Sequence, residues 1–142
     1  MRKILLSISV LLLAATTDAQ TYVSAGLATS VGESYSSSTY PSVEVGRSWD
    51  NLSFGVCLGA ADLNFEDSYW WETKGAASFP MGSASGYFLA GGGSYFGTSH
   101  VLIEYGFGVT RKFGDGPAAW YLQATSWDGT PYVGIGTTIT LD

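Results

Sequence analysis

The amino-acid sequence predicts an all-β protein, an eight-stranded antiparallel up-and-down β-barrel that crosses a membrane with its strands. Apolar residues alternate with small polar residues in eight segments of roughly ten residues each, and a period of two is typical of β-strands. Clusters of turn residues separate these segments. Charged residues make up only 13% of the chain, whereas it contains 19 glycines and 15% aromatic residues. Strand faces so poor in charge are badly suited to contact with water.

Residues 1–19 are predicted to form a secretory signal peptide, and residues 20–142 the barrel domain. Arg2 and Lys3 precede the apolar run ILLSISVLLLAA, which leads to the small residue Ala19. This order is typical of a signal peptide, and the run is too short to span a membrane as a helix. Cleavage after Ala19 leaves four basic and eleven acidic residues. We expect no nucleic-acid partner, because phosphate backbones require clustered Lys and Arg.

The first three strands are predicted at residues 21–31, 40–49 and 52–61. The second and third strands form a hairpin, SVEVGRSWDNLSFGVCLGA, around a two-residue turn at Asp50-Asn51. Such a turn fixes the pairing register of both strands. It places Trp49 opposite Leu52 and Val45 opposite Val56 on the apolar face, with Glu44 opposite Cys57 on the polar face.

The remaining strands follow the same alternation. The sixth strand shows it most clearly, because Val101, Ile103, Tyr105, Phe107 and Val109 share one face. The loop at 114–117 pairs Arg111 with Trp120, and Asp128-Gly129 keeps the seventh and eighth strands in phase. The parity of the connection between the fourth and fifth strands, around residues 80–84, stays open. The five strands are predicted at residues 70–79, 85–92, 99–113, 118–127 and 132–141.

The direction of the apolar face decides between a membrane barrel and a water-soluble one. The polar face carries mainly Ser, Gly, Thr and Ala, and glycine contributes little to a sheet that faces water. Inside a narrow eight-stranded barrel, small residues are needed where the walls crowd. We therefore predict that the apolar face contacts lipid. The polar network expected in the lumen consists of Glu44, Glu72, Lys74, Glu104 and Gln123.

We interpret this network as structural, in preference to a proton or ion path, because buried charges need partners. Aromatic residues near the strand ends are predicted to form outward girdles at the two membrane interfaces. Those expected near the short turns are Trp49, Phe79, Phe113 and Trp120, and those expected near the longer loops are Tyr40, Trp127 and Tyr132.

With this pattern the chain resembles the small eight-stranded outer-membrane β-barrels, the OmpA-like transmembrane domain and its OmpX-like relatives. The last strand, GIGTTITL, is similar to the terminal signal read by the barrel assembly machinery, although it lacks a terminal aromatic residue and ends in Asp142. The resemblance implies outer-membrane localisation, membrane lipids as partners and no shared catalytic residues. We expect no metal site and no cofactor, because Cys57 is the single cysteine and His100 the single histidine.

The function that the sequence favours is a structural or surface-interaction role, with side chains filling the lumen and no open pore. The loops could bind an external partner, which the sequence does not identify. A second hypothesis is a soluble periplasmic or secreted barrel that binds a small apolar ligand, as lipocalins do. A third is a lipid-modifying hydrolase that uses Ser99, His100 and Glu104, although adjacent strand residues point to opposite faces.

Overall fold

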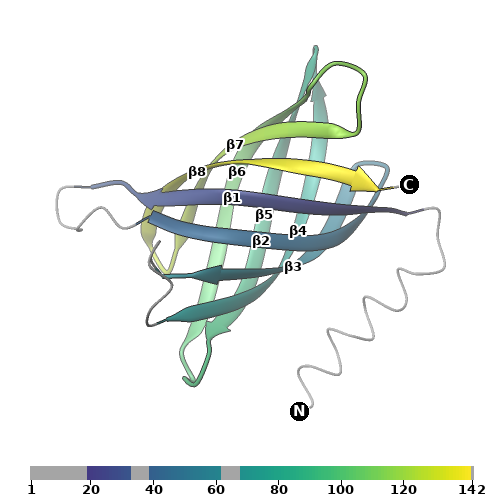
Figure 1. Ribbon diagram of the computed structural model, residues 1–142. Coiled ribbons are helices and arrows are strands. Elements are labelled where there is room, and N and C mark those ends of the chain that lie inside the picture. The colour runs from purple at the N-terminus through teal and green to yellow at the C-terminus, as the bar shows by residue number, and fades with distance from the viewer. Residues whose placement is uncertain (1–18, 33–38, 62–67, 142) are drawn as a thin grey trace.

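The computed structural model describes residues 19–32, 39–61 and 68–141, which form a closed antiparallel barrel of eight strands (Figure 1). Each strand pairs with the next along the chain, and β1 pairs with β8 to close the barrel. The predicted fold class is confirmed. The strands are β1 (Gln20–Ser30), β2 (Thr39–Trp49), β3 (Leu52–Ala60), β4 (Tyr69–Met81), β5 (Ala84–Tyr95), β6 (Val101–Lys112), β7 (Ala118–Trp127) and β8 (Thr130–Leu141).

Residues 1–18 of the predicted signal peptide lie outside the described residues. The acidic residues Asp62, Glu66 and Asp67, which lie between the third and fourth predicted strands in the sequence, are also outside them. Among the residues that the structure does describe, no helix is long and apolar enough to cross a membrane.

The predicted registers of two hairpins are confirmed. Trp49 lies opposite Leu52, and Glu44 lies opposite Cys57. Arg111 lies opposite Trp120 on β6 and β7. Asp50 has a φ of +49° in the turn between β2 and β3, a left-handed conformation that Asp tolerates better than most residues. Turn chemistry and side-chain alternation therefore act together to set these pairings.

The connection between β4 and β5 is a two-residue turn, Gly82-Ser83, between Met81 and Ala84. Gly82 has a φ of +62°, which glycine adopts without steric cost. The pairing continues as far as Trp70 with Tyr95, so β5 is longer than the predicted segment at residues 85–92.

The barrel has a short-turn rim and a loop rim. The short-turn rim holds the β2–β3, β4–β5 and β6–β7 connections, and β1 begins and β8 ends there (Figure 1). The loop rim holds the other four connections.

The apolar face points outward, as predicted. Val43 and Val45 are each 51% exposed, and Ile103 is 57% exposed. The residues that alternate with these along each strand point into the lumen. One of them, Glu104, is only 1% exposed. A soluble barrel for an apolar ligand would instead direct its apolar residues toward a central cavity.

Candidate functional site

The lumen is divided into three layers along the barrel axis. The inward residues of β4 show the order, because Trp70 lies near the loop rim, Glu72 and Lys74 lie in the middle, and Ala76 and Ser78 lie near the short-turn rim. Alternation of the strand directs every second side chain inward. The same order of aromatic, charged and small polar residues recurs on β2, where Tyr40 leads to Glu44 and Ser48.

The middle layer is an ion cluster centred on Lys74. The Lys74 Nζ lies 3.0 Å from Glu44 Oε2, 3.3 Å from Glu72 Oε1 and 3.8 Å from Glu104 Oε2. Glu72 and Glu104 are almost completely buried. The structure thus brings together four of the five residues predicted for the lumen network, contributed by β2, β4 and β6.

The cluster has more acidic groups than basic ones. Both carboxylate oxygens of Glu104 are buried without a hydrogen-bond donor within normal distance. A cavity of about 20 Å³ lies beside the cluster and is lined by Lys74, Glu44, Glu104, Tyr121 and Gln123. A volume of this size accommodates roughly one water molecule, and water commonly completes the bonding of buried polar groups.

Gln123, the fifth predicted network residue, lies outside direct contact with the cluster. Its Oε1 accepts a hydrogen bond from the Tyr87 hydroxyl at 3.1 Å. Gln123 lines both the small cavity and a larger one toward the short-turn rim. Gln123 therefore lies between the ion cluster and the small polar residues near the short-turn rim.

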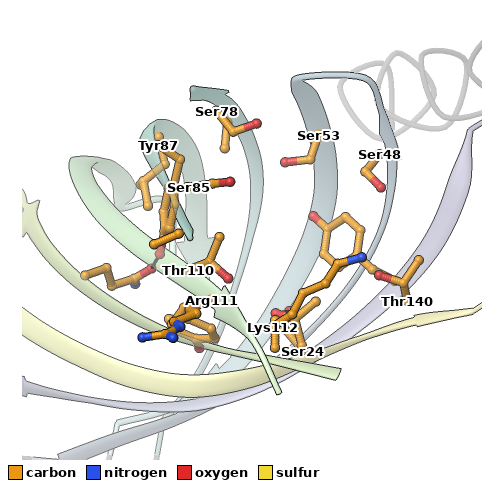
Figure 2. A pocket seen from close by; sticks show the side chains of 18 of the residues that line it. Ser24, Ser48, Ser53, Ser78, Ser85, Tyr87, Thr110, Arg111, Lys112 and Thr140 are labelled. Atoms are coloured by element: carbon orange, nitrogen blue, oxygen red, sulfur yellow. Dashed lines mark hydrogen bonds between the residues drawn. The ribbon is translucent and has the colours of Figure 1, made fainter. Parts of the chain in front are cut away.

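We call the larger cavity the vestibule. It has a volume of about 770 Å³, and its walls carry hydroxyl groups from all around the barrel (Figure 2). Glu44 and Lys74 lie at its inner end, and the short-turn residues Asp50 and Asp115 lie at its mouth. Its hydroxyl-bearing lining includes Ser24, Ser48, Ser53, Ser78, Ser83, Ser85, Thr110, Thr138 and Thr140, together with Tyr22, Tyr87 and Tyr121.

Glycines make room for the tyrosines of the vestibule. The end of the Tyr22 ring occupies the space that a Cβ atom would need at Gly46, and the Tyr22 hydroxyl does the same at Gly55. Tyr87 lies over Gly108 in the same way, and Tyr121 lies over Gly136. Because each ring rests on a neighbouring strand, the centre of the vestibule stays open. This explains the abundance of glycine on the inner face.

An aromatic layer fills the lumen near the loop rim, and it corrects one prediction. Trp127 lies 4.9 Å from Trp70 and 4.7 Å from Tyr132, measured between ring centroids. Tyr40 makes edge-to-face contacts with both Trp127 and Tyr132. The prediction that Tyr40, Trp127 and Tyr132 form an outward girdle is wrong.

Strand parity is the physical reason for this correction. Tyr40 lies four residues from Glu44, and Trp127 lies four residues from Gln123, so each aromatic side chain shares the inward direction of its polar neighbour. Cys57 and Leu102 pack with Trp70 in a small buried cluster.

The four aromatic residues predicted near the short turns have outward positions in the register. Phe79 and Phe113 are exposed on the outer surface, and Phe79 packs against Phe88 with ring centroids 5.5 Å apart. Trp49 lies opposite Leu52, and Trp120 lies opposite Arg111, each on the outward face of its strand.

His100 pairs with Asp128 and not with Glu104. The His100 Nε2 lies 2.8 Å from Asp128 Oδ2, and the Ile103 amide donates to Asp128 Oδ1 at 2.9 Å. Glu104 is buried in the ion cluster, away from this exposed rim. The Ser99, His100 and Glu104 arrangement required for the hydrolase hypothesis is therefore not assembled. Asp128 was not predicted as a partner, because it lies 28 residues from His100 along the chain and no local pattern links the two.

The hydrogen bond from the Ile103 amide, with a further contribution from His100, holds the pKa of the Asp128 carboxyl below its usual range. Asp128 has a φ of +48° in the β7–β8 turn. Its backbone amide also donates to the Ile103 carbonyl at 3.0 Å. Asp128 thus fastens this turn to the first residues of β6.

Comparison with known proteins identifies the class of fold. No family model matches the sequence, and no curated protein matches it. The N-terminal β-barrel domain of Pseudomonas aeruginosa OprF superimposes with a TM-score of 0.60 at 9% identity, over 86% of this chain and 97% of that domain. Neisserial surface protein A (NspA) gives a TM-score of 0.55 at 10% identity, over 88% of this chain and 98% of that structure.

The chain therefore has the eight-stranded fold of small outer-membrane β-barrels. The resemblance to OmpA-like and OmpX-like barrels that the sequence predicts is confirmed at the level of the fold.

Proposed function

We propose that the protein is an outer-membrane barrel with a structural and surface-interaction role, and that its lumen conducts no steady flow of ions. It anchors itself in the bilayer through its outer surface and displays the loop rim to the outside of the cell. The observation that carries this proposal is the occupied lumen, in which an aromatic layer and a buried ion cluster follow one another between the two rims.

The outer surface supports membrane insertion. Large apolar side chains such as Leu58, Phe88 and Phe107 are more than half exposed. Apolar patches of this extent are unfavourable in water but match the hydrocarbon core of a bilayer. Membrane lipids are therefore the partners that the surface favours most directly.

The lumen supports a closed barrel. Eight strands enclose space that side chains can fill. Trp70 is 1% exposed and packs against Trp127, which in turn packs against Tyr132. Below this layer Lys74 of β4 pairs with carboxylates from β2 and β6. An ion entering from the short-turn rim would meet the cluster first and then the aromatic layer.

Export and assembly follow from the same proposal. Residues 1–19 would direct the chain across the inner membrane. The outward Ile139 and Leu141 of β8 would present the terminal signal to the barrel assembly machinery.

Cell fractionation with carbonate washing, followed by gel electrophoresis with and without boiling, tests the membrane location. We expect a band retained in the outer-membrane fraction that migrates faster when it is not boiled. A protein that washes free and shows no such shift while folded in buffer would exclude a membrane barrel.

Planar bilayer recording tests the closed lumen. Protein shown by the gel to be folded should produce no steady conductance, whereas a large general porin in the same bilayers serves as the positive control. A reproducible single-channel conductance from the folded protein would contradict the closed lumen without contradicting the membrane location.

A further inference from the structure

The vestibule has the properties of a ligand site, which the proposed structural role does not use. We propose that it binds a neutral saccharide of about one or two rings that enters from the short-turn rim. Four features of the cavity support this: its size, its closed inner end, its charged groups and the chemistry of its walls (Figure 2).

The size and shape of the vestibule suit a small ligand. Its volume of about 770 Å³ falls within the range of roughly 300–1,000 Å³ that is common for small-molecule sites. The inner end is formed by Tyr22, Glu44 and Lys74, which are fixed by mutual contacts. A ligand that enters from the rim would therefore stop there and remain in contact with the walls.

The balance of charge favours a neutral ligand. Asp50, Asp115 and Lys112 line the mouth of the vestibule, and Arg111 lies at its edge, at an outward position of β6. Lys74 at the inner end is already surrounded by three carboxylates. An anionic ligand would find no uncommitted buried cation, and a cationic ligand would compete with Lys74 itself.

The polar groups of the walls match the hydroxyl groups of sugars. Ser and Thr hydroxyls both donate and accept hydrogen bonds, as sugar hydroxyls do, so either partner can supply the proton. Ser53 of β3 and Ser85 of β5 project into the vestibule from the two strands that flank β4 (Figure 2). The Gln123 amide adds a group that can bond two neighbouring hydroxyls of a ring.

The tyrosines supply the apolar part of such a site. Sugar rings carry C–H groups on their faces, which pack on aromatic rings. Tyr22 donates to Glu44 Oε1 at 2.5 Å, and Tyr87 donates to Gln123 Oε1. Both rings are therefore fixed before a ligand arrives, which reduces the entropy lost on binding. A hydroxyl-lined wall with fixed aromatic rings differs from the apolar cavity that a lipid chain would require.

Titration calorimetry with the refolded full-length mature chain tests the proposal. The protein is held in dodecylphosphocholine micelles, because this detergent has no sugar head group, and maltose and N,N′-diacetylchitobiose serve as probes. Ala76 lines the vestibule, whereas its neighbour Ala77 is exposed on the outer surface. Ala76→Phe should fill the cavity, and Ala77→Phe is the matched control on the same strand.

We expect at least one probe to bind the unsubstituted protein and Ala77→Phe, and Ala76→Phe to weaken binding by roughly tenfold or more, which corresponds to about 1.4 kcal/mol. Equal binding by both variants would place the ligand elsewhere and overturn the proposal. If the unsubstituted protein binds neither probe at roughly 10 mM, ten times a Kd of about 1 mM, the proposal is overturned.

A second measurement keeps the test decisive if Ala76→Phe does not fold. Nuclear magnetic resonance of the unsubstituted protein should show probe-dependent shifts for the amides of Ser53 and Ser85, and unchanged amides for Trp70 and Trp127 in the aromatic layer. Shifts confined to the loop rim or to outward residues would contradict the proposed site.

Discussion

Replacing Lys74 with methionine tests whether the ion cluster stabilises the barrel. The substitution keeps most of the apolar stem and removes the charge that lies 3.0 to 3.8 Å from three carboxylates. With an effective dielectric constant of about 20, each of these contacts represents about 4–6 kcal/mol of Coulomb attraction. Repulsion among the carboxylates and the cost of burying the charges offset most of this sum.

The net loss is therefore expected to be about 3–5 kcal/mol, the usual effect of removing one partner from a buried ion pair. This is a large share of a total stability of about 5–15 kcal/mol. Urea unfolding in lipid vesicles, followed by the mobility difference between boiled and unboiled samples, measures the change. Lys112→Met at the exposed rim is the control and should change stability by less than about 0.5 kcal/mol.

A compensated variant separates charge from packing. Combining Lys74→Met with Glu44→Gln, Glu72→Gln and Glu104→Gln removes every charge of the cluster, and we expect it to recover most of the lost stability. A loss below about 1 kcal/mol for Lys74→Met alone would refute the reasoning, because such a small effect requires the carboxylates to be well hydrated.

Three further substitutions test other parts of the structure. Gly46→Ala should destabilise the barrel by about 1–3 kcal/mol, because its Cβ would overlap a tyrosine ring, whereas Gly75→Ala, with its nearest atom 3.8 Å away, should be neutral. Because the pKa of Asp128 is lowered in the folded protein, its contribution to stability is complete above its unfolded pKa near 3.8 and is lost as the pH falls through the folded value. Amide hydrogen exchange in the first residues of β6 should therefore become faster in acid. The Asp128→Ala variant should not show this pH dependence. Brominated lipids should quench the fluorescence of Trp120 in a variant that keeps it as the single tryptophan, and should leave Trp127 unquenched in the corresponding variant; equal quenching would mean that Trp127 faces lipid.

Strand pairing was the part of the fold most open to prediction from sequence. Asp50-Asn51 fixes one register, and the alternation on either side agrees with it, so Val45 meets Val56 as predicted. The β4–β5 turn was harder to interpret, because Phe79, Pro80 and Met81 form an unbroken apolar run in which alternation disappears. There the turn residues themselves set the pairing.

The lumen was only partly predictable. The alternation of side chains placed Glu44 and Lys74 on the inward face. No local sequence pattern shows that residues from β2, β4 and β6 lie at the same height along the barrel axis, because that height depends on the stagger of the strands. The misplaced Trp127 has a different cause. Its position near a strand end favours an interface role, and this was given more weight than its parity with Gln123, which points it inward.

The pairing of β1 with β8 has a consequence for the order of events during folding. The strand that is synthesised first acquires its second partner only when the strand that is synthesised last is available. Until then, each incomplete sheet has two open edges, which are able to pair with other chains. Contacts between residues so distant in sequence also form slowly. The chain therefore needs protection from aggregation for the whole interval between export and closure, and that need ends in a single step when the last strand pairs with the first.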